Sequence, residues 1–211
     1  MISMLRIKYL QFLEHRRQEG WLSACRFTFY KHEEAVPVEK DLTALRPVKA
    51  PAGGTPELVE IGPENFLCLP LTYLLRSRRE RAGRYFALGY RSFAMVRDGK
   101  VLGDLWYVTR QSGRFDPPHP HLGWFGIDLG PRQAYMFDMW VDPGERGNAL
   151  TTWFLGSVLH EQRRRGLEKV YGYFAAQNVP ALWVHRLIGY QELPRFIVRR
   201  FLLYETARAK N

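Results

Sequence analysis

The sequence contains little cysteine and no long apolar run. Only two of its 211 residues are cysteines, Cys25 and Cys68, so it does not have the composition of a small secreted domain held together by disulfides. No apolar stretch reaches the ~20 residues that a membrane-spanning helix needs. The segment MISMLRIKYLQFLEHRR lacks an uninterrupted apolar core followed by small residues, which is unlike a secretory signal. We therefore expect a cytoplasmic protein.

Acidic residues are fewer than basic ones. The 21 Asp and Glu stand against 31 Lys and Arg, which gives a formal net charge of +10. Such an excess favours anionic partners, among them phosphates, nucleic acids, membrane surfaces and acidic substrates. The basic residues are spread along the chain, which is weak evidence for nucleic acid, and we do not expect that partner. A basic helix over residues 3–19 is the segment that suits contact with a membrane surface.

The chain is long enough to bury a full hydrophobic core, since 46% of its residues are hydrophobic. It contains no internal repeat and no low-complexity tract. We predict an N-terminal helical extension over residues 1–45 and a main domain over residues 57–211. A linker or loop rich in proline and glycine, residues 46–56, separates them.

Within the extension, apolar residues at helical spacing predict a helix over residues 3–19 and a second one over residues 21–30. Residues 32–42 alternate loosely and can form a strand. Pro37 cannot donate a backbone hydrogen bond, so it favours an edge position for that strand.

The main domain alternates strand and helix patterns. We predict strands at 57–62, 132–141 and 168–174, mostly helical structure over 63–90, a hairpin around Asp98-Gly99, a loop over 113–126, helices at 149–165 and 179–188, and a strand or hairpin at 192–205. This order indicates a mixed α/β sheet with helices on its faces. Two strands joined by one helix form a βαβ unit, so the strands at 132–141 and 168–174 should be parallel.

The stretch VDPGERGNALTTWF joins the strand at 132–141 to the helix that follows. Pro143 should end the strand, and Gly144 and Gly147 permit a sharp turn. The first N–H groups of the new helix are left without partners, and its positive dipole end is exposed. A phosphate fits such a place, with Arg146 as a further contact. A turn without a ligand is the other interpretation.

A second stretch, NVPALWVHRLIGYQEL, lies downstream. Asn178 can cap a helix, Pro180 suits its first turn, and Gly189 suits the residue after its end. By itself this pattern is typical of a short, well-capped helix.

Together the two stretches resemble the GCN5-related N-acetyltransferase (GNAT) superfamily. The family's central motif, Val-x-Pro followed by Arg-Gly-x-Gly-x-Gly/Ala, corresponds here to Val141-Asp142-Pro143 and Arg146-Gly147-Asn148-Ala149-Leu150-Thr151. Its later motif, Asn-x-x-Ala followed by Gly-Phe/Tyr, corresponds to Asn178, Ala181 and Gly189-Tyr190. The resemblance covers roughly residues 57–205.

The resemblance implies the GNAT fold, an α/β fold with a mixed sheet, and an N-acyltransferase that uses acetyl-CoA or another acyl-CoA as co-substrate. The acceptor would be an amine of unknown identity, acylated by direct attack, and a homodimer is a further expectation. The residues implied to bind the cofactor are Val141, Arg146, Gly147, Asn148, Ala149, Leu150, Thr151 and Asn178.

The sequence departs from the family pattern at three positions. Ala149 replaces a glycine, Thr151 replaces a glycine or alanine, and His185 occupies the place of the family's thiolate-protonating tyrosine. A methyl group at 149 could press on the pyrophosphate, although a helical alanine should need no unusual φ. These departures motivate a second hypothesis, a non-catalytic CoA-binding or interaction module that retains the fold.

We predict His185 as the catalytic acid and Asp138 as the catalytic base; a surface histidine and a structural aspartate are the alternatives. Strand alternation places Asp138 with Trp140 on one face, and Phe137, Met139 and Val141 on the other. An apolar strand should raise the pKa of Asp138.

Other candidates carry less weight. Tyr135 and Asp128 are weaker choices for the base. The pair His119 and His121 lacks a third ligand, so we expect no metal site.

Overall fold

The computed structural model describes residues 2–51, 54–146, 149–202 and 204–210. Its strands form one sheet in the order β10-β9-β1-β7-β6-β5-β4-β2, with β3 paired to β5 and β8 paired to β1. The strands are β1 Tyr30–Asp41, β2 Glu57–Ile61, β3 Thr72–Tyr73, β4 Arg91–Arg97, β5 Lys100–Thr109, β6 Gln133–Val141, β7 Lys169–Ala175, β8 Gln191–Glu192, β9 Phe196–Phe201 and β10 Tyr204–Ala209.

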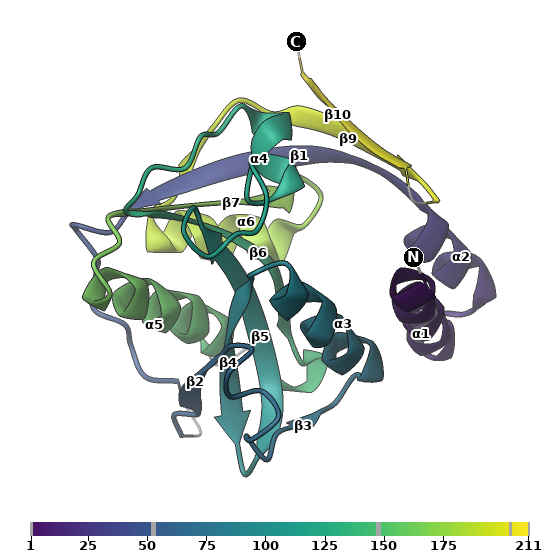
Figure 1. Ribbon diagram of the computed structural model, residues 1–211, viewed down its shortest axis with the longest axis horizontal. Coiled ribbons are helices and arrows are strands. Elements are labelled where there is room, and N and C mark those ends of the chain that lie inside the picture. The colour runs from purple at the N-terminus through teal and green to yellow at the C-terminus, as the bar shows by residue number, and fades with distance from the viewer. Residues whose placement is uncertain (1, 52–53, 147–148, 203, 211) are drawn as a thin grey trace.

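Helices cover both faces of the central strands (Figure 1). Buried residues of α5 and partly buried residues of α6 pack on one face, and residues of α3 and α4 pack on the other. We call these the α5 face and the α3 face. The helices are α1 Ile2–Glu19, α2 Trp21–Phe29, α3 Arg76–Ala87, α4 Pro120–Phe125, α5 Leu150–Arg164 and α6 Val179–Ile188, with a 3-10 turn η1 at Pro143–Glu145. Among the described residues, no helix combines the length and the apolar character needed to cross a bilayer.

The predicted βαβ unit is present. Residues 133–135 of β6 pair in parallel with residues 169–171 of β7, and α5 connects the two strands. The hairpin predicted around Asp98-Gly99 is also present as β4 and β5, and both turn residues have positive φ. Asp and Gly tolerate that conformation better than most residues.

The predicted N-terminal extension is helical only up to Phe29. Residues 30–41 form β1, whose residues 35–41 pair with β7 and whose residues 30–35 pair with β9. The edge position expected from Pro37 is therefore wrong. The Pro37 carbonyl accepts from the Leu193 N–H, so the backbone polar side of Pro37 faces β8 and β9. Pro37 lies between the residues of β1 that pair with β9 and those that pair with β8, so its missing N–H interrupts neither of these two ladders.

Two further expectations differ from the structure. Residues 63–90 were expected to be mostly helical, but only α3, Arg76–Ala87, is a helix there. The expected loop over 113–126 contains the short helix α4, which begins after the cap residue His119. Pro70 explains part of the first difference, because a helix cannot continue through it without losing a hydrogen bond.

Candidate active site

The parallel strands β6 and β7 stop pairing partway along their length. Their pairs end at Tyr135 and Tyr171, and a Cβ at Gly172 would lie only 3.1 Å from the Met136 carbonyl oxygen, so the strands are still close there. Beyond these residues no pair joins residues 137–141 to residues 173–175. We call these two segments the β6–β7 fork. Along the chain, the β6 side of the fork is followed by η1 and then by the N-terminus of α5.

A β-bulge shapes the β6 side of the fork. Trp106 pairs with Phe137 and Asp104 pairs with Trp140, so Asp138 and Met139 stand opposite a single residue of β5. Asp138 has a φ of 50°. The bulge breaks strand alternation, so Phe137 lies on the α3 face while Met139 and Val141 lie on the α5 face. The expected grouping of Phe137 with Met139 and Val141 is therefore wrong.

Asp138 forms ion pairs with two arginines of α3. Its Oδ2 accepts from Arg81 and from the Tyr85 hydroxyl at 3.1 Å, and its Oδ1 accepts from Arg78 Nη1 at 3.3 Å. Arg78 Nη2 also donates to the Asp138 carbonyl at 2.8 Å and lies 2.5 Å from the fully buried Asp104.

These charges determine the pKa of Asp138. Burial alone would raise it, but the positive charges of Arg78 and Arg81 and the hydrogen bonds from Arg81 and Tyr85 outweigh burial and lower the pKa to about 2. The expected rise is therefore wrong. A carboxylate with so low a pKa is a weak base at neutral pH, so its environment favours a structural role.

His185 lies on α6 between two aromatic rings. Its ring centroid is 4.9 Å from Phe174 and 4.8 Å from Tyr190. Nδ1 lies 2.7 Å from the Ala181 carbonyl, which can only accept, so Nδ1 carries the proton and Nε2 of the neutral ring is an acceptor. Burial lowers the pKa of His185. A neutral imidazole whose one N–H is engaged is poorly suited to protonate a leaving thiolate.

The N-terminus of α5 has an unusual cap residue. Ala149 has a φ of 61° and a ψ of 10°, the left-handed conformation, and makes no side-chain cap hydrogen bond. Our expectation that this alanine needs no unusual φ is wrong. Gly147 and Asn148 lie outside the described residues. Leu150, the first residue of the helix, is buried, and Thr151 is half-buried.

Within the described part of the chain, no side chain caps the N-terminus of α5, and this has a chemical consequence. The first N–H groups of a helix have no intrahelical partner, and over the length of α5 the peptide dipoles place partial positive charge at this end. The side chain of Arg146 is directed back to the sheet, with Nε donating to the Val141 carbonyl at 3.1 Å. Backbone donors of α5 can therefore serve an anion.

Asn178 caps α6 as predicted. Its Oδ1 accepts from the Ala181 N–H at 3.2 Å, and Gly189 ends the helix in the left-handed conformation. Capping α6 accounts for Asn178 without a cofactor, so its role in cofactor binding stays a prediction. Val141 is buried at the end of β6, in the core on the α5 face.

A polar aromatic cluster on the α3 face was not found from the sequence. His121 Nδ1 lies 2.7 Å from the Tyr135 hydroxyl, and the His121 ring is 4.9 Å from that of Tyr173 in the fork. Lys31 Nζ donates to the Tyr173 hydroxyl at 3.1 Å. Burial holds the pKa of His121 well below its usual value, so the ring is neutral.

Part of this cluster had a signal in the sequence. The His-x-His spacing is visible in the sequence, but as a metal site it lacks a third ligand, and the spacing alone gives no other role. Lys31 and Tyr173 are 142 residues apart, so only the pairing of β1 with β7 brings them together.

The site thus combines a parallel strand pair that separates, a bulge in one of the two strands, and an uncapped helix N-terminus beside them, all in a mixed α/β sheet. No protein-family model and no curated protein matches the chain. Solved structures do match its fold.

One is the GCN5-related glucosamine N-acetyltransferase region of a fungal multi-domain GH3 beta-N-acetylglucosaminidase (TM-score 0.55, 16% identity, 89% of this chain and 23% of that chain). Another is a tandem GNAT protein from the clavulanic acid biosynthesis pathway (TM-score 0.51, 18% identity, 90% of this chain and 58% of that chain). A third is a GNAT-family acetyltransferase from Colwellia psychrerythraea (TM-score 0.50, 12% identity, 93% of this chain and 72% of that chain).

The chain has the fold of the GNAT superfamily, and the fold expected from the two motifs is confirmed. Identities of this size show the fold alone. The chain spans 23% and 58% of the length of the first two structures, so their activities are not transferred to it directly.

Proposed function

We propose that this protein is an acyl-CoA-dependent N-acyltransferase that uses acetyl-CoA and acylates an amine. The observation that carries the proposal is the β6–β7 fork, which is followed along the chain by η1 and the N-terminus of α5 in a GNAT fold. The identity of the amine is not assigned. Cytoplasmic localisation and a homodimer accompany this proposal as predictions.

The N-terminus of α5 would hold the CoA pyrophosphate. The N–H groups of Leu150 and Thr151 lie in the first turn, and among the described residues no side chain caps them. The left-handed turn at Ala149 is a conformation that glycine adopts without steric cost, so alanine here keeps such a turn and adds one methyl group. When bound, acyl-CoA supplies the acyl group as an activated thioester.

The amine would approach from the α3 face of the fork. Direct transfer requires a group that takes a proton from the attacking amine. We assign this role to His121 rather than to Asp138, because His121 lies beside Tyr173 of the fork, whereas the Asp138 carboxylate is held in ion pairs by Arg78 and Arg81. When Nδ1–H donates to the Tyr135 oxygen, Nε2 is left as the acceptor for the proton. Asp138 would act as a positioning residue that fixes the bulge.

Proline at position 151 tests the cofactor site. Proline removes the N–H of Thr151 but is tolerated in the first turn of a helix, as Pro180 shows at the second residue of α6. We expect Thr151→Pro to weaken acetyl-CoA binding roughly tenfold in calorimetry, because one charge-assisted hydrogen bond is lost. Thr151→Ser keeps the N–H and the hydroxyl and is the matched control. Equal affinity of the proline variant and the wild type would contradict the proposed phosphate site.

A second candidate function is a non-catalytic CoA-binding module. The observation that favours it is that both predicted catalytic groups are engaged within the chain, Asp138 with Arg78 and Arg81, and His185 with the Ala181 carbonyl. Thiol release from acetyl-CoA over a panel of amines separates the two functions. CoA binding without turnover supports the module, whereas absence of CoA binding contradicts both.

A further inference from the structure

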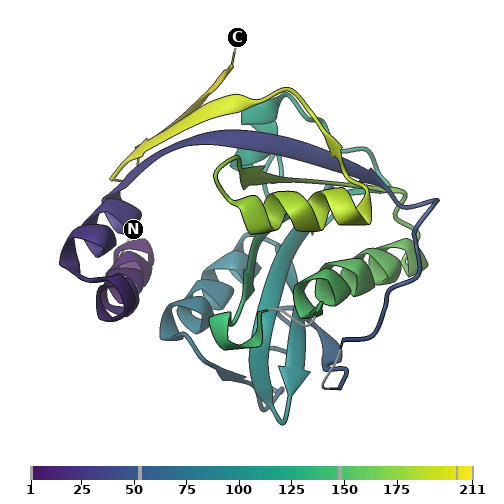
Figure 2. The ribbon, with the colours of Figure 1, turned by 180° about the vertical axis from the view of Figure 1, so that it is seen from behind.

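Large apolar side chains are exposed at the end of the molecule that carries α2 and the turn between β9 and β10. Leu22 is 84% exposed, and Tyr204, at 75%, is the most exposed aromatic of the group. We call this group the aromatic tip; it consists of Trp21, Leu22, Phe29, Phe201, Leu202 and Tyr204. Figures 1 and 2 show α2 and this turn at the same end of the ribbon, on the far side from α5.

The segments that carry the aromatic tip lie side by side. The Leu202 N–H donates to the Phe29 carbonyl at 2.7 Å, and Phe201 pairs with Tyr204 across the β9–β10 ladder and with Tyr30 of β1. The ring of the buried Phe12 lies 5.0 Å from Trp21 and 6.4 Å from Phe29, at the two ends of α2. The tip is therefore built from neighbouring segments that come from both ends of the sequence.

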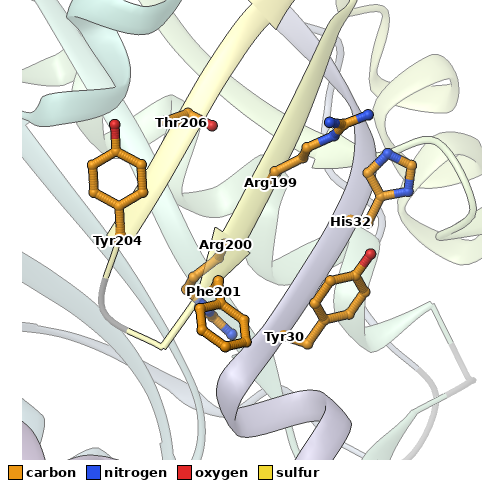
Figure 3. A pocket seen from close by; sticks show the side chains of 7 residues that line it. All are labelled: Tyr30, His32, Arg199, Arg200, Phe201, Tyr204 and Thr206. Atoms are coloured by element: carbon orange, nitrogen blue, oxygen red, sulfur yellow. The ribbon is translucent and has the colours of Figure 1, made fainter.

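Arginines surround the aromatic tip. Arg16, Arg17 and Arg26 are exposed on α1 and α2, and Arg16 lies over the Trp21 ring at 5.9 Å. Arg199 and Arg200 line a hollow of about 450 Å³ together with Tyr30, Phe201 and Tyr204 (Figure 3). Over the described residues, none of these five arginines takes part in an ion pair.

We propose that the aromatic tip docks on an anionic phospholipid surface. Tryptophan and tyrosine suit the boundary between headgroups and acyl chains, leucine and phenylalanine suit the acyl side, and arginine suits anionic headgroups. The helices lie on the surface and do not span it, in agreement with their length and composition.

Two other occupants fit the tip less well. A second copy of this chain would bring two arginine-rich surfaces together, and like charges repel. Single-stranded nucleic acid would use the aromatic rings but would gain little from Leu22 and Leu202, because stacking needs a π-face.

The structure extends the predicted membrane contact beyond residues 3–19. Ile7 and Phe12 of α1 are buried, and Phe12 packs against Trp21 and Phe29. Leu5 and Tyr9 of α1 are exposed, and α1 also contributes Arg16 and Arg17, while α2 and the β9–β10 turn supply the aromatic tip.

Vesicle co-sedimentation of the full chain tests the proposal. We expect binding to vesicles with about 30% phosphatidylglycerol to be roughly tenfold tighter than to pure phosphatidylcholine, and to weaken at high salt. The double variant Trp21→Ser/Leu22→Ser should lower binding to the anionic vesicles by about tenfold or more. Leu67→Ser and Trp183→Ser are matched controls, since both residues are highly exposed elsewhere and should leave binding unchanged.

Three outcomes would overturn the proposal. One is no binding to the anionic vesicles at low salt. Another is an equal loss of binding in the double variant and the two controls. The third is that the wild type forms a dimer in sedimentation velocity, or binds single-stranded nucleic acid, and that the double variant loses this association but binds vesicles as tightly as the wild type. Circular dichroism of each variant establishes that it is folded.

Discussion

At the residue scale, the candidate site depends on two residues with left-handed backbones. Asp138 and Ala149 both have positive φ, at 50° and 61°. Aspartate tolerates this region better than most residues, while for alanine it costs about 1–2 kcal/mol. Asp138 lies in the bulge of β6, and Ala149 precedes the first residue of α5. The backbone is therefore left-handed at both places that shape the site.

Replacing Ala149 with glycine should relieve this strain. Glycine has no Cβ but loses more conformational entropy on folding, so we expect Ala149→Gly to be between neutral and about 1 kcal/mol more stable in urea unfolding. The exposed helical Ala87→Gly is the control and should lose about 0.5–1 kcal/mol. If Ala149→Gly lowers the free energy of unfolding as much as Ala87→Gly does, the left-handed conformation of Ala149 carries no strain.

The charge on Asp138 should contribute to stability in a defined pH range. Its pKa is lowered from 3.8 to about 2 in the folded protein. The carboxylate form is thus favoured by folding, so the contribution, about 2 kcal/mol, is complete above pH 4 and is lost as the pH falls from 4 to 2.

Asp138→Asn tests this contribution. It should cost about 3 kcal/mol at neutral pH, because Arg81 keeps its buried charge without a partner, and it should flatten the acid dependence between pH 4 and 2. The measurement is urea unfolding across that range. Asp128→Asn is the control, since its pair with Arg110 is exposed and should contribute less than about 1 kcal/mol. Identical acid profiles for Asp138→Asn and the wild type would rule out this contribution.

The sequence predicts part of the candidate site and not its electrostatics. The place of Asp138 on β6 and the start of α5 near Ala149 follow from local patterns. The pKa of Asp138 depends on Arg78 and Arg81, which are 60 and 57 residues away, and no local pattern gives that distance. The cluster of His121 with Tyr173 escaped for the same reason, since it forms only across α4 and β7.

At the scale of elements, α3 begins without a cap of its own. Its cap residue Leu75 makes no side-chain hydrogen bond. Glu14 of α1 supplies that contact instead, accepting from the Ser77 N–H at 3.0 Å and from the Ser77 hydroxyl at 2.5 Å. A carboxylate at this position also complements the positive end of the α3 dipole.

Removing this contact should therefore loosen two helices at once. We expect Glu14→Ala to lower the free energy of unfolding by about 1–2 kcal/mol and to speed hydrogen exchange at the first turn of α3 and along α1. Glu19→Ala is the control, since Glu19 is exposed and its hydrogen-bond and ion-pair partners among the described residues are His15 and Ser23, both outside α3. Unchanged exchange at the Ser77 amide would show that α1 does not cap α3.

The elements that the sequence predicts well are those with local signals. The hairpin β4–β5 has a turn dipeptide, and the helices α5 and α6 have clear periodicity or caps. Pro37 lacks a backbone N–H donor, and this local signal alone predicts an edge position for β1. Its partner β7 lies about 130 residues downstream, and pairing at that separation is decided by burial of both strands.

At the scale of the whole molecule, β1 joins the N-terminal residues to the body of the protein. It lies between β7 and β9, and Val36 and Val38 are buried against Phe174 of β7. Without β1, the strands β9 and β10 would have no described connection to the sheet. The predicted division at residues 46–56 thus crosses a continuous sheet, and we expect one cooperative unfolding unit rather than two.

Val38→Ala distinguishes the two possibilities. Val38 is fully buried on β1, and its truncation should cost about 2 kcal/mol through lost burial and a cavity. If the chain unfolds as one unit, Val38→Ala should lower the hydrogen-exchange protection of β5 and of β1 by the same free energy, although β5 lies on the far side of β6. Calorimetry should then give a single transition in which the calorimetric enthalpy equals the van't Hoff enthalpy. If protection falls in β1, β9 and β10 while β5 keeps its wild-type exchange, the residues before 46 unfold separately, and the two-part division is the correct description of this protein.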